Sequence, residues 1–390
     1  MKQWKKVVAV LSAVALLVGL TPNQAYAEVN AEAMCQDTVE VIAATVTDET
    51  TSANGWAIFT TARAGKLTAE QADAYYANLE TLLKTQDSSL LTESNTANIV
   101  AILAVTAIGK DATNVGGYNL LEPLADMSYN TGYVTTGATA LIAMDSKNYT
   151  IPTVGAGGTQ TTREALVQYL LDQRNSTGTW GYSYGGTDYA SVDTIAMVIQ
   201  ALAPYYNSNA DVKSAVDDGL AEMSAQQLAD GGYGSACSEA QAIIALTSLG
   251  IDPLTDARFV KNGATLLDGL NVNYVQGQGF KGWDGNIDMA FSTSQAAYGL
   301  VAYQRFVSQK TSLFNMTDAV PIQPQEPSTA GTEATTGTEV TTGTEATTTE
   351  ATTEARDKTP KTGDVTPVVW LAGMALISIT GMVIVNRKKQ

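Results

Sequence analysis

A ten-residue apolar segment with alanine at its second position recurs along the middle of the chain. Each copy is apolar on nearly every side, which is typical of a helix buried within a protein rather than lying at its surface. The aligned alanines of the copies are Ala57, Ala101, Ala140, Ala196, Ala242 and Ala297. A unit that recurs in this way indicates a fold assembled from similar pieces, because one piece alone cannot bury its apolar face.

Ordinary amphipathic helices are expected between the copies, at 69–83, 163–173 and 212–227. Several helix starts show Ser or Thr followed three residues later by Glu or Gln, the pattern of a capping box. Examples are Thr68 with Gln71, Thr161 with Glu164, and Ser238 with Gln241. Strand signals are scarce. The sequence therefore predicts an all-α fold of about six helical hairpins that close into a barrel, with the repeated apolar helices inside.

The N-terminus has the three parts of a secretory signal peptide. Basic residues within the first six positions precede an uncharged apolar run, and Ala25-Tyr26-Ala27 supplies the small residues of a cleavage site. This order predicts that residues 1–27 are removed by signal peptidase between Ala27 and Glu28, and that the rest of the chain is exported.

The C-terminus combines an apolar span with a basic tail. Residues 365–385 carry no charge and are long enough to cross a bilayer, and the basic tail favours a cytoplasmic end. The preceding Thr-Pro-Lys-Thr-Gly resembles the cell-wall sorting signal of Gram-positive surface proteins, Leu-Pro-any-Thr-Gly, with Thr359 in place of the leucine. The resemblance implies that residues 359–390 are a sorting signal. A sortase would then cut between Thr362 and Gly363 and join Thr362 to peptidoglycan.

Between these ends, residues 317–358 form a Thr- and Glu-rich tract without aromatic residues. Such a tract cannot bury enough apolar surface to fold, and its acidic side chains repel one another. It is predicted to be a disordered linker between the anchor and a folded domain at residues 28–316. The protein is thus expected to be extracellular and anchored to the cell wall.

The net charge and the missing histidine exclude several classes of function. The chain has 22 basic and 39 acidic residues and a net charge of −17, so it lacks the basic surface that binds nucleic acid. Without histidine it has no Ser-His-Asp or Cys-His nucleophile pair and no imidazole zinc ligand. We therefore expect no metal site and no required cofactor.

Three loops that contain glycine and an aromatic residue lead into copies of the repeat. They are Gly178-Thr179-Trp180-Gly181, Gly231-Gly232-Tyr233-Gly234 and Gly279-Phe280-Lys281-Gly282-Trp283, and Gln173 and Gln227 precede the first two. These loops resemble the repeats of the terpenoid cyclase and protein prenyltransferase superfamily, and residues 191–197 are similar to a segment of the cobalamin carriers. The resemblance implies an α/α toroid, and it makes a corrinoid a candidate ligand.

The catalytic groups of that superfamily are absent from the chain. It has no Asp-any-Asp-Asp motif, and the prenyltransferase zinc site requires a histidine. The pair Asp217-Asp218 lies in an amphipathic segment, where a solvated face is expected. We therefore predict a domain that binds a ligand rather than a cyclase or a prenyltransferase.

Aromatic and acidic residues gather in the loops that lead into the repeated helices, at one predicted mouth of the barrel. Aromatic walls with a few polar groups are the usual form of a ligand pocket, here for a glycan or another small molecule. The candidates are Trp180, Tyr182, Tyr184, Tyr189, Asp193, Tyr233, Glu239, Trp283 and Asp284. A structural interpretation stays open, in which Trp180 and Tyr233 wedge between hairpins and Asp193 lies in the first turn of its helix.

Two other functions remain open for the same domain. A glycan hydrolase or lyase would need a catalytic acid pair, for which Asp193 and Glu239 are the candidates. An adhesin or spacer would use its outer surface and would need no internal site.

The cysteines and one acidic loop allow further predictions. Cys35 and Cys237 are candidates for a disulfide because the exported compartment permits oxidation, with two free thiols as the alternative. The segment from Asp284 to Asp288 begins like a calcium loop, but it lacks the glycine and the glutamate that an EF-hand needs. A polar turn is expected there.

Overall fold

The computed structural model describes residues 30–324. This part of the chain is predominantly α-helical with a few short strands, which confirms the prediction of a helical fold. None of its helices is long and apolar enough to span a membrane. The predicted signal peptide, the sorting signal and their processing residues Ala27, Glu28, Thr362 and Gly363 lie outside the described residues.

Each copy of the apolar repeat lies on one helix, and each of the aligned alanines is buried. The six helices are α3 (Ser52–Ala64), α5 (Ala97–Ala107), α7 (Val134–Asp145), α9 (Val192–Leu202), α11 (Ala236–Ser248) and α13 (Ser294–Val307). We call them the inner helices. The prediction that the repeat marks buried helices is confirmed.

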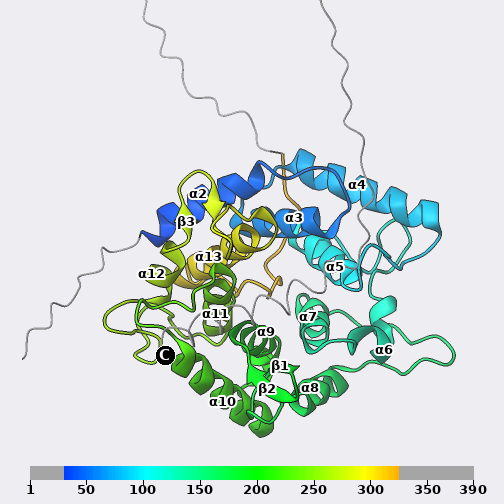
Figure 1. The fold of residues 1–390 in the computed structure, drawn as a ribbon. Coiled ribbons are helices and arrows are strands. Elements are labelled where there is room, and N and C mark those ends of the chain that lie inside the picture. Colours follow the sequence, from blue (N-terminus) through cyan, green and yellow to red (C-terminus); the bar gives the residue numbers. More distant parts are fainter. Residues whose placement is uncertain (1–29, 325–390) are drawn as a thin grey trace, which may run out of the picture. The chain divides into compact units, whose positions relative to one another are not determined.

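The inner helices follow one another in space as they do in sequence. Each contacts the next, and the last, α13, also contacts the first, α3. Figure 1 shows them around a common centre. Near the starts of α3 and α13 the rings of Trp56 and Tyr298 lie 5.4 Å apart, and near their ends Arg305 donates a hydrogen bond to the backbone oxygen of Arg63. These two neighbours therefore run in the same direction.

Amphipathic or shorter helices lie outside the inner helices (Figure 1). They are α2 (Ala31–Ala43), α4 (Ala69–Gln86), α6 (Met127–Asn130), α8 (Arg163–Asp172), α10 (Ala210–Gln226) and α12 (Leu266–Asn271). In α4 the buried Tyr75, Leu79 and Leu83 recur at helical spacing, so one face packs on the core. The three amphipathic helices predicted from the sequence correspond to α4, α8 and α10.

Two short antiparallel hairpins interrupt the helices. β1 (Gly181–Tyr184) pairs with β2 (Thr187–Ala190) before α9, and β3 (Tyr274–Val275) pairs with β4 (Gly279–Phe280) before α13. The turn of the first hairpin is Gly185-Gly186, and both glycines have positive φ, a conformation that costs glycine little. The short 3₁₀ and π segments are η1 (Pro123–Ala125), η2 (Ala203–Tyr205) and η3 (Met289–Thr293).

One of the predicted capping boxes forms. The Thr68 side chain accepts the backbone N–H of Gln71, and the Gln71 side chain accepts the backbone N–H of Thr68. In contrast, α8 is capped by Thr162, and Ser238 lies inside α11, whose N-cap is Ser235. For α8 the adjacent Thr161 and Thr162 offer similar caps. At α11 the Ser235 side chain makes no capping bond, and Glu239 accepts the backbone N–H of Ser235 instead.

The chain continues past α13 as residues 308–322, which we call the C-terminal segment. It packs on the C-terminal ends of the inner helices. The backbone N–H of its buried Met316 donates to the carbonyl oxygen of Ser146, just after α7, and Phe314 stacks on Phe59 of α3. The predicted start of the linker therefore falls inside a segment that packs on the domain, because part of that segment is apolar and buried.

Asp318 links the C-terminal segment to α3 and α13 through two ion pairs. Its carboxylate accepts hydrogen bonds from Arg63, at 2.8 Å, and from Arg305. The buried guanidinium of Arg63 also donates to the backbone oxygens of Leu313 and Asn315. Burial by itself would raise the pKa of Asp318, but the two arginines outweigh it and lower the pKa to about 2. Composition assigned Asp318 to the linker because it does not show which acids meet buried cations.

Replacing Asp318 with asparagine should destabilise the domain by about 2 to 4 kcal/mol, because two buried arginines would lose the charge that compensates them. Since folding lowers the pKa of Asp318, its stabilisation is present above about pH 4 and should be lost as the pH falls toward 2. Urea unfolding of the full chain and of the variant at several pH values measures both effects. An equal loss in Glu40→Gln, whose side chain is exposed on α2, would contradict this account.

Candidate ligand-binding site

The loops that lead into α9, α11 and α13 lie together because these helices start at the same end. Asp193 in the first turn of α9 accepts a hydrogen bond of 3.0 Å from Ser238 Oγ near the start of α11. Cys237 Sγ lies 3.9 Å from Ser292 Oγ, just before α13. The predicted ligand-binding residues all belong to these loops or first turns, so the structure places them at one end of the inner helices.

Trp180 is fully buried between α8 and α10. Its indole N–H donates to the carbonyl oxygen of Leu170 on α8 at 2.7 Å. Gly219 on α10 lies against the ring, since a Cβ at that position would be 3.4 Å from it. No face of the ring is left for a ligand, which corrects the predicted binding role. The structural interpretation, a wedge between hairpins, fits these contacts.

Glu239 is fully buried and holds the loop that precedes its own helix. Its Oε1 accepts the backbone N–H groups of Tyr233, Gly234 and Ser235. Among the described residues, neither its Oε2 nor the buried Tyr233 hydroxyl has a hydrogen-bond partner. Burial raises the pKa of Glu239 to about 7, although the backbone bonds oppose that shift. Glu239 therefore shapes the loop, and its buried carboxylate cannot reach a ligand in solution, which corrects its predicted ligand contact. Tyr233 is half-buried with its hydroxyl buried, and its predicted role stays a prediction.

Replacing Glu239 with glutamine should make stability less dependent on pH. Because folding raises the pKa of Glu239 from 4.5 to about 7, the native protein keeps a proton that the unfolded chain releases, and stability falls as the pH rises between those values. An amide cannot ionise, yet it still offers an oxygen to the three N–H groups. Melting temperatures of the full chain at pH 5 and pH 7.5 should differ less in the variant than in the wild type.

The control for this measurement is Glu70→Gln, whose side chain is exposed in the first turn of α4. It should keep the wild-type difference between the two pH values. If Glu239→Gln also keeps that difference, Glu239 does not hold a proton in the folded protein.

Asp193 is half-buried against α11. Burial raises its pKa, while the bond from Ser238 and its place in the first turn of α9 favour the carboxylate. Its predicted partner in catalysis, Glu239, faces the backbone of its own loop and does not reach solvent. This arrangement corrects the proposed acid pair, because only Asp193 of the two could approach a substrate.

A buried glutamine network joins three inner helices, and the sequence analysis did not identify it. Gln200 of α9 donates to the side-chain oxygen of Gln241 on α11 at 2.8 Å. Gln241 in turn donates to Gln295 at 2.8 Å and to the Tyr298 hydroxyl at 2.9 Å, both on α13. A buried amide without partners is costly, so these bonds fix the three helices in register. The signal that could have found the network is a glutamine inside an otherwise apolar repeat.

Both cysteines are free thiols, so the predicted disulfide is not formed. Cys35 is buried on α2, Cys237 belongs to α11, and α13 packs against both of these helices. Burial raises the pKa of each thiol to about 12, so both stay protonated at neutral pH. Each acts as a small apolar side chain in the core.

Besides the partly buried Tyr233, four of the predicted aromatic residues keep accessible surface. Trp283 before α13 is 75% exposed, and Tyr184 in the β1–β2 hairpin is 60% exposed. Tyr182 and Tyr189 are half-buried and stack across the same hairpin, with ring centroids 5.4 Å apart. We call these four residues the aromatic set. They are the part of the predicted site that a ligand in solution can contact.

The acidic loop before α13 uses its carboxylates within the loop. Asp284 accepts hydrogen bonds from the backbone and side-chain amides of Asn286, and these bonds lower its pKa. Asp288 accepts backbone N–H groups at the start of η3. No group of three or more Cys, Asp or Glu side chains suited to a metal ion occurs within residues 30–324. The contacts are those of a polar turn.

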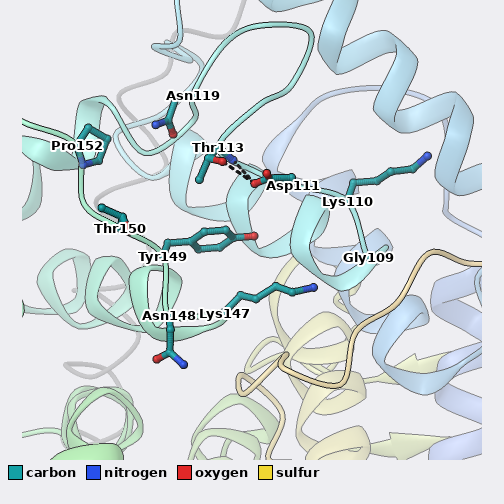
Figure 2. A pocket seen from close by; sticks show the side chains of 10 residues that line it. All are labelled: Gly109, Lys110, Asp111, Thr113, Asn119, Lys147, Asn148, Tyr149, Thr150 and Pro152. Carbon is teal, nitrogen blue, oxygen red and sulfur yellow. Dashed lines mark hydrogen bonds between the residues drawn. The ribbon is translucent and has the colours of Figure 1, made fainter.

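Two cavities among the described residues lie elsewhere. One of about 600 Å³ is formed by the loops after α5 and α7, at residues 109–119 and 147–152 (Figure 2). A smaller one, of about 190 Å³, lies where α2 packs near the ends of α3 and α13. Neither is lined by a predicted ligand-binding residue. The aromatic set therefore forms an open surface rather than the wall of either cavity.

No model of a known protein family matches the chain, and no curated protein is significantly similar to it. The resemblance to the terpenoid cyclase superfamily thus stays a prediction that rests on the repeated helices and on their glycine-containing loops.

Proposed function

We propose that the protein is an exported, wall-anchored binding module, an α/α toroid that holds a glycan on the aromatic set. The observation that carries the proposal is Trp283, a large aromatic side chain that is 75% exposed in a loop leading into an inner helix. Its exposed ring is available to stack on the flat apolar face of a ligand.

The contacts between helices support the toroid. Each of the six inner helices contacts the next, the succession closes between α13 and α3, and a further helix lies outside each of them (Figure 1). In such a fold the loops before the inner helices share one end, where the aromatic set lies. The buried Trp180 also fits, since it contacts α8 and α10 of adjacent hairpins instead of a ligand.

The chemistry of the aromatic set favours a glycan. The flat apolar face of a sugar ring packs on exposed aromatic rings, and its hydroxyl groups bond to nearby polar groups such as those of the Asp284 turn. Two exposed rings on separate loops suit an extended chain of sugars. A corrinoid would need an enclosing cavity beside these residues, and they line neither the cavity of about 600 Å³ nor that of about 190 Å³. The buried Glu239 likewise gives no support to a hydrolase.

Replacing Trp283 or Tyr184 with alanine should weaken glycan binding about tenfold each, the effect expected from losing one stacked ring. The full chain would be titrated with chitohexaose and cellohexaose, and its binding to purified peptidoglycan measured by co-sedimentation. Trp283 is exposed, so binding should also change the intrinsic tryptophan fluorescence, and Trp283→Ala should abolish that change.

The matched control is Val307→Ala. Val307 is an exposed apolar residue, 49% accessible, at the last position of α13 and thus at the other end of the inner helices. It should bind like the wild type. If both aromatic variants keep wild-type affinity, or if none of the three probes binds, the aromatic set is not a glycan site.

Replacing Thr362 with alanine should move the protein out of the cell-wall fraction, because a sortase must recognise this threonine before it joins the residue's carbonyl carbon to peptidoglycan. The measurement is immunoblotting of wall, membrane and medium fractions from Gram-positive cells that express the full chain. Thr366→Ala, a conservative change in the apolar span, should leave the wall fraction intact. Wall attachment that persists in Thr362→Ala would remove the sorting signal from the proposal.

A further inference from the structure

The cavity of about 600 Å³ is at the opposite end of the inner helices from the aromatic set. The loops that form it follow the C-terminal ends of α5 and α7 (Figure 2). Its volume lies in the range of small-molecule sites. The cavity is therefore separate from the aromatic set.

The two loops are held in place before any ligand arrives. The hydroxyl groups of Tyr149 and Thr106 share a hydrogen bond of 2.7 Å, which ties the second loop to α5. Arg163 donates to the backbone oxygen of Tyr149 at 2.9 Å. In the first loop Asp111 accepts the backbone N–H and the hydroxyl of Thr113. A site organised in this way loses little conformational freedom on binding.

The cavity brings two lysines together in a strongly acidic chain of net charge −17. Lys110 pairs with Asp73 at 3.1 Å. The Lys147 ammonium donates to the backbone oxygen of Ala319 at 3.1 Å and forms no ion pair with any residue in the range 30–324. Figure 2 shows Lys147 and Tyr149 among the side chains that line the cavity. An uncompensated cation of this kind attracts a carboxylate.

The remaining lining groups suit a sugar ring. Asn119, Asn148 and Thr150 bring amide and hydroxyl groups to the cavity, and Pro152 adds an apolar surface. Such groups both donate and accept hydrogen bonds, as ring hydroxyls require. We propose that this cavity binds a small saccharide that carries a carboxylate, with Lys147 pairing with the carboxylate and the amide and hydroxyl groups binding the ring.

The test is isothermal titration of the full chain with glucuronic acid, with glucose as the uncharged comparison. Glucuronic acid should bind, and glucose should bind at least tenfold more weakly because it cannot pair with Lys147. The affinity for glucuronic acid should also fall as salt is raised, since the attraction is electrostatic. No heat of binding with millimolar glucuronic acid, or equal affinity for glucose, would overturn the proposal.

Variants locate the site. Lys147→Gln should weaken glucuronic acid binding about tenfold, and Lys147→Arg, which keeps the charge, should restore most of it. Lys110→Gln is the second variant, because it leaves the bond from Lys147 to Ala319 intact and should also weaken binding. Lys84→Gln is the matched control, since Lys84 lies on α4 outside the cavity, paired with Glu80. Wild-type affinity in both cavity variants would overturn the placement.

The proposed saccharide cavity and the proposed glycan site on the aromatic set can be tested independently. Trp283→Ala should leave glucuronic acid binding unchanged, and Lys147→Gln should leave chitohexaose binding unchanged, because the two sites lie at opposite ends of the inner helices. If Trp283→Ala reduces the affinity for glucuronic acid as much as Lys147→Gln does, the acid binds at the aromatic set and the cavity proposal is wrong.

Discussion

The close approach of the inner helices is the constraint on which the other features of the structure depend. Two helices can pack this closely only where one of them has little or no side chain. At Gly299 of α13 a Cβ would lie 2.9 Å from the Cβ of Ala240 on α11, and at Gly55 of α3 it would lie 2.7 Å from Val100 on α5. The buried alanines of the repeat serve the same purpose. Because successive inner helices pack against each other, the loops before α9, α11 and α13 lie at one end of them.

Buried polar groups fix the relative positions of the helices, since each polar group finds its hydrogen-bond partner in only one arrangement of the helices. The glutamine network headed by Gln241 connects α9, α11 and α13, and Asp318 connects the C-terminal segment to the first and last inner helices through Arg63 and Arg305. Glu239 does the same for the loop before α11. Leaving any of these groups unpaired in the core would be costly, so they specify one register of helices that apolar packing alone would leave less well defined.

Much of the fold was predictable, and less of the site. Periodicity located all six inner helices because a buried helix must be apolar on every side, and amphipathicity located three of the outer ones. Loop composition singled out the loops before α9, α11 and α13, but it could not separate Trp180, which is buried, from Trp283, which is exposed. That difference depends on Gly219 of a distant helix, which leaves room for one ring. The predicted disulfide between Cys35 and Cys237 is absent for a similar reason. The positions of α2 and α11, which carry the two cysteines, depend on how each helix packs against α13.

The sequence by itself determined the helical class, the number of buried helices and the chemistry that is absent, because these follow from local periodicity and from composition. It also located the loops in which an exposed aromatic residue could lie. Only the tertiary structure decided which side chains stay accessible, that Glu239 binds its own backbone, that residues beyond 316 belong to the domain, and that Lys110 and Lys147 meet at one cavity. Each of these outcomes depends on contacts between residues far apart in the chain, and no local pattern encodes such contacts.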